Sequence, residues 1–331
     1  MNVEKPIVFV PQWMPKNGID YIKRYCQLKY NPKKNITTKK EFIEGARDAD
    51  GCVVFVSNFI DAEVLEYCPN IRVISSFGKG YDNIDLEACA AKNVCVTINK
   101  STLTESTADM ALGLILSLCR KIVPADAHIR DGNFKGWHPQ NFLGKEFHHS
   151  VLGIIGLGAI GQAIAIRAKA FHVKGQYFDI VQNKEFEKLY GYTFKSSLED
   201  LLSTSDFIVI ATNYNKSSYR LLNKDNIKFV KKGCMIVNIS RGSTVDELAI
   251  GEALEEGFLG GYASDVFSFE DKFTPKKTDY IPNSLLKSVQ NTVFSPHLGT
   301  GTVEARKILA QDTAIQLVDA LYSGNADGRI I

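Results

Sequence analysis

Residues 151–171 read VLGIIGLGAIGQAIAIRAKAF, and this stretch decides how the second half of the chain folds. A short apolar run leads into Gly156, Gly158 and Gly161, which have GxGxxG spacing, and a helix-period pattern follows at once. A strand that turns into a helix over such glycines brings backbone N–H groups and the helix N-terminus close to a phosphate. Because the glycines stand in that context, we interpret the stretch as a dinucleotide-binding turn rather than a chance glycine turn.

An acidic residue supports this interpretation. Asp179 ends the next strand-like run, VKGQYFD, about 20 residues after the glycines, where a carboxylate would bind the ribose hydroxyls of the cofactor. The same carboxylate would repel a 2′-phosphate, so the sequence favours NAD over NADP, although Lys184 leaves NADP open. Ala159 and Ile160, which lie between the glycines, are expected to contact the cofactor through their backbone.

Short β-branched runs alternate with helix-period patterns along the chain, which predicts an α/β fold with parallel sheets in two Rossmann-like domains. Between two series of such runs, TESTADMALGLILSLCRKIVPADAHIRDG predicts one long connecting helix that ends at Gly132. The C-terminal TVEARKILAQDTAIQLVDALYSG predicts another helix, closed by Gly324. We expect this last helix to return to the first series. A substrate domain of residues 1–102 and 299–331 would then be interrupted by an NAD-binding domain of residues 103–298.

The composition argues against several classes of protein. The 331 residues carry 39 basic and 37 acidic side chains, a net charge of +2, and no basic tract that would indicate nucleic-acid binding. No apolar run reaches the roughly 20 residues of a membrane span, so we expect no membrane partner. The 7 cysteines are scattered without CxxC spacing, which predicts reduced thiols, a cytoplasmic location and no metal site.

Three polar residues follow apolar runs of the second series, where α/β folds place their sites. Arg241 follows MIVNIS and precedes a glycine, so its guanidinium could grip an oxyanion in a fork. Glu270 lies just past GGYASDVF, and His297 lies in the constrained loop SPHLG. Each alone would more often be an ordinary surface or structural residue. As a set they fit acid/base chemistry, because histidine suits proton transfer near neutral pH and a carboxylate can fix its tautomer.

Together, NISRGSTVDE, DVFSFED and SPHLG resemble the D-isomer-specific 2-hydroxyacid dehydrogenases in order and spacing. The resemblance implies two α/β domains with the cofactor domain inserted into the other, a cleft between domains, a homodimer, and NAD as cofactor. It implies that Arg241 binds the substrate, that His297 is the acid/base and that Glu270 hydrogen-bonds His297. It also puts Asp265 at the nicotinamide carboxamide and Thr107 near the cofactor.

One turn departs from the usual pattern of that family. Residues 77–83 read FGKGYDN, a tight turn whose glycines we expect the backbone to require, with Lys79 where relatives usually have a small apolar residue. A group in the family that carries lysine there is phosphonate (phosphite) dehydrogenase, and the segment GNFKGWHPQNF resembles the same group. This narrower resemblance implies that phosphite, a small dianion, is bound by Lys79, Gly80, Arg241 and Trp137.

The charge of phosphite agrees with a second cation beside Arg241. Each unit-charge pair at about 4 Å is worth about 4 kcal/mol at an effective dielectric of about 20, before desolvation, so a dianion gains more than a monoanion. We therefore expect NAD-dependent oxidation of phosphite to phosphate, with water as the nucleophile. Whether His297 or Arg241 takes the proton from that water stays open. Two alternatives remain: a D-2-hydroxyacid dehydrogenase acting on glycerate, glyoxylate or hydroxypyruvate, and a non-catalytic NAD-sensing corepressor.

Overall fold

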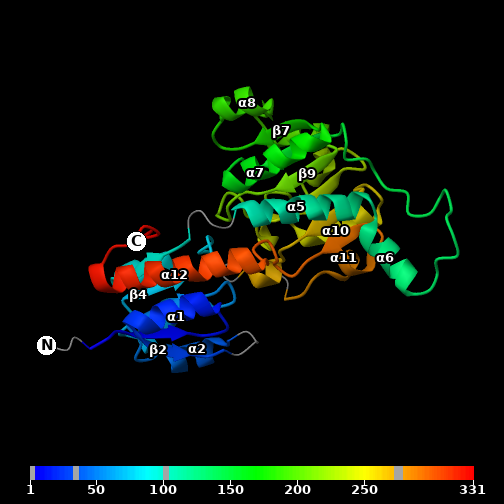
Figure 1. The fold of residues 1–331 in the computed structure, drawn as a ribbon. Helices are drawn as coiled ribbons and strands as arrows, with labels where there is room; N and C mark the ends of the chain where they lie inside the picture. Colours follow the sequence, from blue (N-terminus) through cyan, green and yellow to red (C-terminus); the bar gives the residue numbers. More distant parts are fainter. Residues whose placement is uncertain (1–3, 33–36, 100–103, 272–278) are drawn as a thin grey trace. The chain divides into compact units, whose positions relative to one another are not determined.

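The structure is a computed structural model, and it describes residues 4–32, 37–99, 104–271 and 279–331. The chain divides into two compact units, drawn in Figure 1. Unit 1 consists of Met1–Leu103 and Thr300–Ile331, and unit 2 consists of Thr104–Gly299. Each unit contains a parallel sheet with helices packed on it, so the predicted α/β fold with parallel sheets is confirmed.

Unit 1 is built on a parallel sheet with the strand order β2-β1-β3-β4-β5. Strands β3 and β4 are buried along their whole length, as expected for inner strands of a sheet that is covered on both faces. The strands are β1 (Ile7–Val10), β2 (Gln27–Tyr30), β3 (Gly51–Val54), β4 (Val73–Ser76) and β5 (Cys95–Thr97). The helices before unit 2 are α1 (Lys16–Tyr25), α2 (Lys39–Ala46), α3 (Ala62–Tyr67) and α4 (Leu86–Ala91).

The C-terminal helix α12 (Val303–Ser323) belongs to unit 1, although its sequence follows unit 2. Its side chains Leu309 and Leu317 share a buried cluster with Val8 of β1 and Ile22 of α1. The predicted stop at Gly324 is confirmed, because this residue ends the helix in a left-handed conformation (φ 70°). Unit 1 is therefore discontinuous in sequence.

Unit 2 is built on a parallel sheet with the strand order β12-β11-β10-β9-β6-β7-β8. The chain starts at β6, adds β7 and β8 on one side, and then returns to add β9 to β12 on the other side. The order reverses between β6 and β9, and open sheets of this kind bind ligands outside the carboxyl ends of their strands at that point. The strands are β6 (Val151–Ile155), β7 (Lys174–Phe178), β8 (Thr193–Phe194), β9 (Phe207–Ile210), β10 (Met235–Asn238), β11 (Gly261–Ser264) and β12 (Thr292–Phe294).

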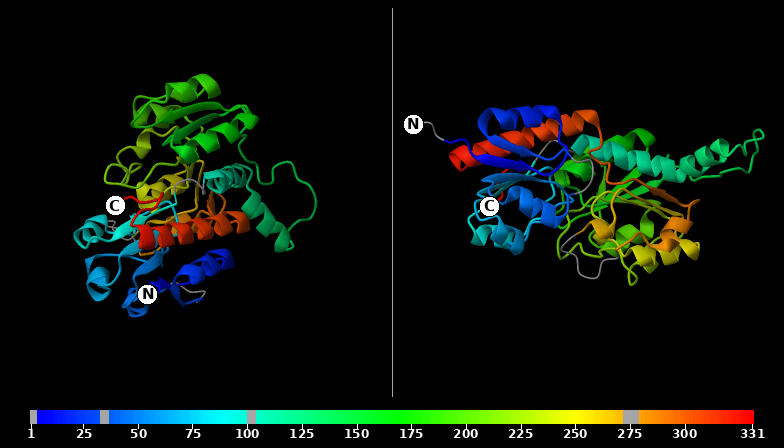
Figure 2. Two further views of the ribbon diagram at one scale, coloured as in Figure 1. Left: turned by 60° about the vertical axis from the view of Figure 1, so that its left-hand side comes forward. Right: turned by 90° about the horizontal axis from the view of Figure 1, so that it is seen from below.

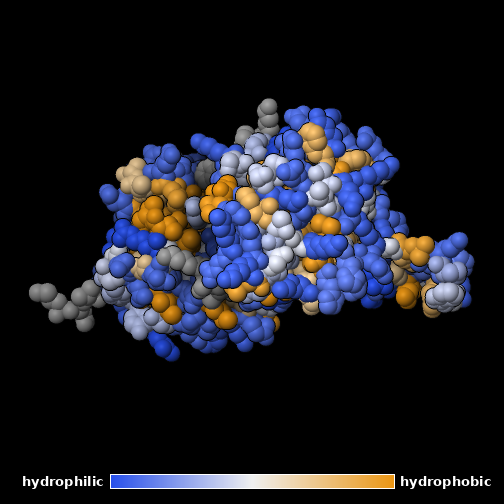
Figure 3. Space-filling view, turned by 90° about the horizontal axis from the view of Figure 1, so that it is seen from above, coloured by the Kyte–Doolittle hydropathy of each residue, from blue (hydrophilic) through white to orange (hydrophobic). Residues whose placement is uncertain are grey.

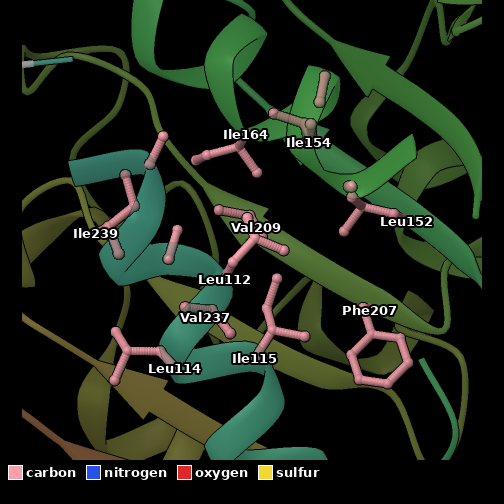
Figure 4. Close-up of a cluster of buried hydrophobic side chains, with 14 of the residues drawn as sticks. Leu112, Leu114, Ile115, Leu152, Ile154, Ile164, Phe207, Val209, Val237 and Ile239 are labelled. Atoms are coloured by element: carbon pink, nitrogen blue, oxygen red, sulfur yellow. The ribbon is translucent and has the colours of Figure 1, made fainter. Parts of the chain in front are cut away.

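Apolar side chains cover both faces of this sheet. On one face, Leu112 and Ile164 from two helices pack with Val209 of β9 in the cluster of Figure 4. On the other face, Ile208 of β9 packs with Ile250 in a second cluster. A fully buried side chain of this size contributes about 1.5–3 kcal/mol. The helices are α5 (Thr104–Cys119), α6 (Ile122–Arg130), α7 (Ala159–Ala168), α8 (Lys184–Tyr190), α9 (Leu198–Thr204), α10 (Glu247–Glu255) and α11 (Asn283–Lys287), with 3₁₀ turns η1 (Lys169–Phe171), η2 (Ile227–Phe229), η3 (Gly242–Thr244) and η4 (Ser268–Glu270).

The expectation of one long connecting helix ending at Gly132 is wrong, because this stretch forms two helices, α5 and α6. Lys121 separates them with a left-handed backbone (φ 56°). Pro124 supplies a physical reason: it has no N–H, and inside a continuous helix it would remove a hydrogen bond and clash with the preceding turn. The break moves Pro124 into the first turn of α6, where that N–H would have no partner inside the helix.

Helix α6 and the segment after it extend from the body of unit 2, and we call residues 122–144 the arm (Figures 1 and 2). The arm exposes large apolar side chains to an unusual degree, including Ile129 (58%), Trp137 (85%) and Leu143 (72%). Apolar groups are visible on it at the right edge of Figure 3. An exposed apolar cluster of this kind often marks an interaction surface.

Two further observations bear on the classes of protein considered above. In the described part of the chain, no helix is long and apolar enough to cross a membrane. The cysteines are free thiols, and all except the half-buried Cys95 are buried. The cytoplasmic location inferred from their spacing stays a prediction.

Candidate active site

The glycine-rich turn joins β6 to α7, and each of its glycines meets a different steric requirement. Gly156 has a left-handed backbone (φ +92°), and a Cβ there would lie 2.8 Å from the Thr212 backbone. A Cβ on Gly161 would lie 2.1 Å from the Gly156 carbonyl oxygen. Around Gly158, an added Cβ would meet no described atom within 4 Å apart from those of Gly158 and its two chain neighbours. The turn therefore leaves its backbone open at Gly158, as the close approach of a pyrophosphate requires.

Asp179 follows β7 and lies directly beside this turn. Its Oδ2 accepts a hydrogen bond from the Leu157 N–H at 2.6 Å, and its Oδ1 accepts one from the Ile180 N–H at 2.6 Å. Each carboxylate oxygen keeps capacity for another donor, such as a ribose hydroxyl. Ala159 and Ile160 occupy the first turn of α7, where N–H groups have no partner inside the helix. These residues fit a dinucleotide cofactor.

Arg241, Glu270 and His297 follow three neighbouring strands, β10, β11 and β12. Because these strands are parallel, their carboxyl ends lie at one edge of the sheet. Nδ1 of His297 lies 2.8 Å from Oε2 of Glu270. The other oxygen of Glu270 accepts a hydrogen bond from the Phe267 N–H at 2.7 Å. The His297 and Glu270 side chains are 29% and 22% exposed, so the pair is held by the protein yet open to solvent.

The loop that carries His297 is held by Asp265. Oδ1 of Asp265 accepts hydrogen bonds from the Ser295 hydroxyl (2.6 Å) and the Leu298 N–H (2.7 Å). Oδ2 accepts one from the Gly299 N–H (2.7 Å), and the Asp265 carbonyl accepts one from the His297 N–H (2.8 Å). His297 has a left-handed backbone (φ 56°), which is unfavourable for a residue with a Cβ. The bonds to Asp265 hold it in that conformation.

Thr107 lies next to the same loop. A Cβ added to Gly299 would lie 3.2 Å from Oγ1 of Thr107 and 3.3 Å from Oδ2 of Asp265. Both side chains are almost fully buried, with 7% of Thr107 and 2% of Asp265 exposed. The structure thus brings Thr107 and Asp265 together beside the His297 loop, and their predicted contacts with the cofactor stay predictions.

The backbone of Arg241 is fixed where β10 ends. Its carbonyl accepts hydrogen bonds from the Asn238 amide (2.9 Å) and the Thr244 hydroxyl (2.7 Å). One guanidinium nitrogen, Nη1, donates to the Ser240 carbonyl at 2.9 Å. The turn η3 therefore presents Arg241 from the same sheet edge as the histidine–glutamate pair.

Lys79 and Gly80 lie in unit 1, in the turn after β4. The Asn99 N–H donates to the Gly78 carbonyl at 3.0 Å, and the Ser76 hydroxyl donates to the Gly80 carbonyl at 3.0 Å. Lys79 is half-buried. Gly78 has no left-handed backbone, and an added Cβ would approach no atom closer than 3.9 Å. The expectation that the backbone requires glycine is therefore wrong at Gly78.

Trp137 lies on the arm, away from the strand ends that carry His297. The first turn of α5, which contains Thr107, lies beside the His297 loop, and the arm follows the other end of this helix. At 1.5 Å per residue, a helix of 16 residues spans about 24 Å. Figure 2 shows the arm extending from the body of unit 2. Unit 2 therefore does not bring its own Trp137 to the histidine–glutamate pair.

Comparison with known proteins identifies the family. The family described as "D-isomer specific 2-hydroxyacid dehydrogenase, NAD binding domain" matches residues 112–299. Glyoxylate reductase from Thermococcus kodakarensis is 35% identical over 318 residues, covering 95% of this chain and 92% of that protein. The chain belongs to the D-isomer specific 2-hydroxyacid dehydrogenase family. Unit 2 is accordingly the NAD-binding part of this dehydrogenase, and NAD is its cofactor.

Solved structures of similar proteins match nearly the whole length of this dehydrogenase. The TT0316 protein from Thermus thermophilus has a TM-score of 0.87 and 31% identity, with 98% of this chain and 100% of that chain covered. An NADPH-dependent glyoxylate/hydroxypyruvate reductase from Sinorhizobium meliloti, solved with NADP and malonate, has a TM-score of 0.83 and 25% identity, with 99% and 97% covered. The narrower resemblance to phosphonate dehydrogenase is not supported, because similar curated proteins, such as those from Thermococcus kodakarensis and Pyrococcus furiosus, carry the name glyoxylate reductase.

Two carboxylates next to the site are not distinguished by any sequence pattern. Glu247, at the start of α10, and Asp271, directly after Glu270, are each 4% exposed. Asp271 stands inside the quoted segment DVFSFED, and Glu247 ends NISRGSTVDE. An acidic residue in the first turn of a helix is ordinary, since it complements the helix dipole, so nothing in the pattern distinguished Glu247.

Proposed function

We propose that this dehydrogenase catalyses the NAD-dependent interconversion of a small 2-oxo acid and the corresponding D-2-hydroxy acid. This is the type of reaction that the name glyoxylate reductase describes. The observation that carries the proposal is the contact of 2.8 Å between His297 and Glu270 at the carboxyl edge of the NAD-binding sheet. Arg241 follows the neighbouring strand β10, which supports a role in binding the substrate carboxylate. The identity of 35% to a glyoxylate reductase supports the substrate class.

The residues of the pair divide the chemistry between them. NADH, when bound, supplies the hydride that reduces the 2-oxo acid. Nδ1 of His297 is engaged by Glu270, so Nε2 is the nitrogen that gives a proton to the substrate carbonyl oxygen. The carboxylate of Glu270 fixes the ring and offsets its positive charge. In the opposite direction Nε2 takes the hydroxyl proton, while Arg241 holds the carboxylate.

A separate group of residues would bind each part of the dinucleotide cofactor. The glycine-rich turn and the start of α7 would hold the pyrophosphate, and Asp179 would bind the ribose hydroxyls. Asp265 and Thr107 would lie at the nicotinamide. The pyrophosphate-binding residues are Gly156, Gly158, Ala159, Ile160 and Gly161.

The test is an NADH oxidation assay with a panel of 2-oxo acids: glyoxylate, hydroxypyruvate, pyruvate and a larger homologue. We expect turnover of the smallest acids, and we expect His297→Asn to lower kcat while NADH still binds. Removal of a general acid/base typically costs 10²–10⁴-fold, so a loss of about that size is expected. His172→Asn, at an exposed histidine of unit 2, is the matched control. No turnover of any acid in the panel would refute the proposal.

Lys79 favours a second candidate, oxidation of phosphite. In that reaction phosphite and water yield phosphate, the hydride of phosphorus passes to NAD, and one proton is released. In the described part of the chain the Lys79 ammonium has no hydrogen bond or ion pair, so its charge is not consumed by a partner there. Lys79 would serve with Gly80 and Arg241 in binding phosphite, whereas Trp137 lies too far from His297 within unit 2 to join them, and the larger charge of the dianion supports a second cation.

The two candidates are distinguished by one experiment. NADH formation is measured with NAD and either phosphite or glycolate, in the wild type and in Lys79→Ala. If phosphite is the substrate, it is oxidised faster than glycolate, and the variant loses phosphite turnover while NAD affinity is retained. Glycolate oxidation without any phosphite oxidation at millimolar concentration removes the second candidate.

We also propose that the dehydrogenase forms a homodimer through the arm. The exposed apolar side chains of the arm, including Trp137 (85%) and Leu143 (72%), support this because a monomer would leave them in water. Analytical ultracentrifugation of the wild type and of Trp137→Ser tests the idea. A wild type that sediments as a monomer would refute it, and dissociation of the variant would support it.

A further inference from the structure

Two buried carboxylates join the turn that carries Arg241 to the turn that carries Glu270. Asp271 directly follows Glu270, and its Oδ2 accepts a hydrogen bond from the Ser243 N–H at 2.8 Å. Ser243 lies in η3, the turn that begins directly after Arg241. This bond therefore ties the end of one turn to the middle of the other.

Glu247 connects the same two turns from the other side, because it follows the Arg241 turn and accepts hydrogen bonds from the Glu270 turn. It opens α10, the helix that follows η3, and its Oε1 accepts a hydrogen bond from the Ser268 N–H at 2.9 Å. Its Oε2 accepts one from the Ser268 hydroxyl at 2.7 Å. Ser268 opens η4, the turn that ends in Glu270. Each side of the junction thus supplies a carboxylate to donors on the other side.

The two turns also touch through their backbones. A Cβ on Gly242 would lie 1.9 Å from the carbonyl carbon of Phe267 and 2.0 Å from the nitrogen of Ser268, so a larger residue there would push the turns apart. Phe267 in turn donates its N–H to Glu270 at 2.7 Å. A short path of direct contacts therefore runs from the neighbour of Arg241 to Glu270.

The burial of both acids calls for a physical reason. Glu247 and Asp271 are each 4% exposed, and a buried carboxylate is costly unless hydrogen bonds satisfy it. Burial also raises the pKa of the Glu247 carboxyl. The Ser243 and Ser268 donors to these acids come from the turns of the active site, so the positions of the buried carboxylates depend on the geometry of that site.

We propose that Glu247 and Asp271 are positioning residues that hold the Arg241 turn against the Glu270–His297 pair. The anion-binding guanidinium and the proton-donating imidazole then keep one separation, matched to the two ends of a small substrate. The inference rests on the proposed function, because it assumes that Arg241 and His297 act on one molecule.

Conservative and alanine variants separate geometry from charge. Glu247→Gln keeps an acceptor for the Ser268 N–H, and the Ser268 hydroxyl can rotate to accept from the new amide. Asp271→Asn likewise keeps an acceptor for Ser243, whereas alanine at either position leaves a buried N–H without its partner. Glu255→Ala, at an exposed residue of α10, is the matched control.

The assay measures kcat and KM for glyoxylate with NADH, together with the dissociation constant of NADH and the melting temperature. We expect Glu247→Ala and Asp271→Ala to lower kcat/KM on the order of 10²-fold, the usual effect of a shift of about 1 Å at a reacting group. NADH affinity should not change, and the glutamine and asparagine variants should recover most of the activity. If the alanine variants do not fold, Ser268→Ala, which removes one hydroxyl bond, should show a smaller loss of the same kind.

Two outcomes overturn the proposal: a folded alanine variant with wild-type kcat/KM, or a conservative variant that loses as much as alanine. A wild type that turns over no acid of the 2-oxo acid panel refutes the proposed function instead. In that case the position of the His297 imidazole is followed by the ¹⁵N NMR signals of its ring nitrogens. These signals are assigned as the ones that disappear in His297→Asn. The alanine variants should perturb these signals and the conservative variants should not. Unchanged signals in the alanine variants would again overturn the proposal.

Discussion

Replacement of Gly158 by alanine should weaken cofactor binding without harming the fold. Gly158 has φ −68° and ψ −169°, an extended backbone that any residue adopts, and an added Cβ meets no described atom within 4 Å. The methyl group would instead occupy the space through which a pyrophosphate approaches the backbone. Gly158→Ala therefore tests the cofactor assignment separately from stability.

The expected magnitudes follow from these contacts. A hydrogen bond to a charged group is worth about 1.5–3 kcal/mol, so the loss of one backbone bond to the pyrophosphate should weaken NADH binding about 10- to 150-fold. Alanine also restricts the unfolded chain, which should raise the free energy of unfolding by about 0.4–1 kcal/mol. Gly161→Ala should behave differently, because its Cβ would lie 2.1 Å from the Gly156 carbonyl oxygen and must displace backbone.

The assay is titration of NADH by fluorescence, with thermal melting on the same samples. Gly113→Ala is the matched control, because Gly113 lies in α5 and an added Cβ there also meets no described atom within 4 Å. The control should raise stability and leave NADH affinity unchanged. A Gly158→Ala protein that binds NADH as tightly as the wild type would show that the cofactor does not approach this backbone.

Two further predictions concern stability and thiol chemistry. Burial alone would raise the pKa of the Asp206 carboxyl, but hydrogen bonds from Lys231 and the Val151 N–H lower this pKa overall. The ionised carboxylate therefore stabilises the fold near neutral pH, and this contribution is lost as pH falls through the native pKa. Asp206→Asn should lower the free energy of unfolding by about 1.5–3 kcal/mol at neutral pH in urea titrations, and a gap to wild type that stays constant down to about pH 3 would contradict this. Burial raises the pKa of Cys26 to about 11 and of Cys89 to about 12, so iodoacetamide should label neither at pH 8 in the native protein and both in urea, as read by mass spectrometry. Rapid native labelling of either cysteine would show that its segment opens to solvent.

The strands that sequence could predict are those with buried apolar runs. Strands β3, β4, β9 and β10 are buried at every position, so their sequences stand out from the polar helix surfaces. Strands β2 and β8 have no such run, and each lies at the edge of its sheet. The residues of β2 read QLKY and alternate between exposed and half-buried, while β8 has 2 residues. Pairing along one side with little burial leaves no apolar run, so these strands depend on the neighbour that they join.

For the site, sequence could point to residues that follow strands, because a parallel sheet gathers those positions at one edge. It could not point to Glu247 or Asp271, whose burial depends on η3 and η4 packing against each other over Gly242. That contact joins segments that are separated along the chain, and no local pattern encodes it. The split between α5 and α6 was in principle readable, because Pro124 stands inside the pattern.

Asp265 illustrates how one buried side chain can serve two purposes. A carboxylate offers about four acceptor positions, two on each oxygen. Oδ1 uses two for Ser295 and Leu298, and Oδ2 uses one for Gly299, so one position on Oδ2 remains. The carboxamide contact proposed for Asp265 is therefore limited to a single hydrogen bond. Because the other bonds hold the left-handed His297, a movement of Asp265 toward the cofactor would also move the imidazole, which would link cofactor binding to the position of the proton donor.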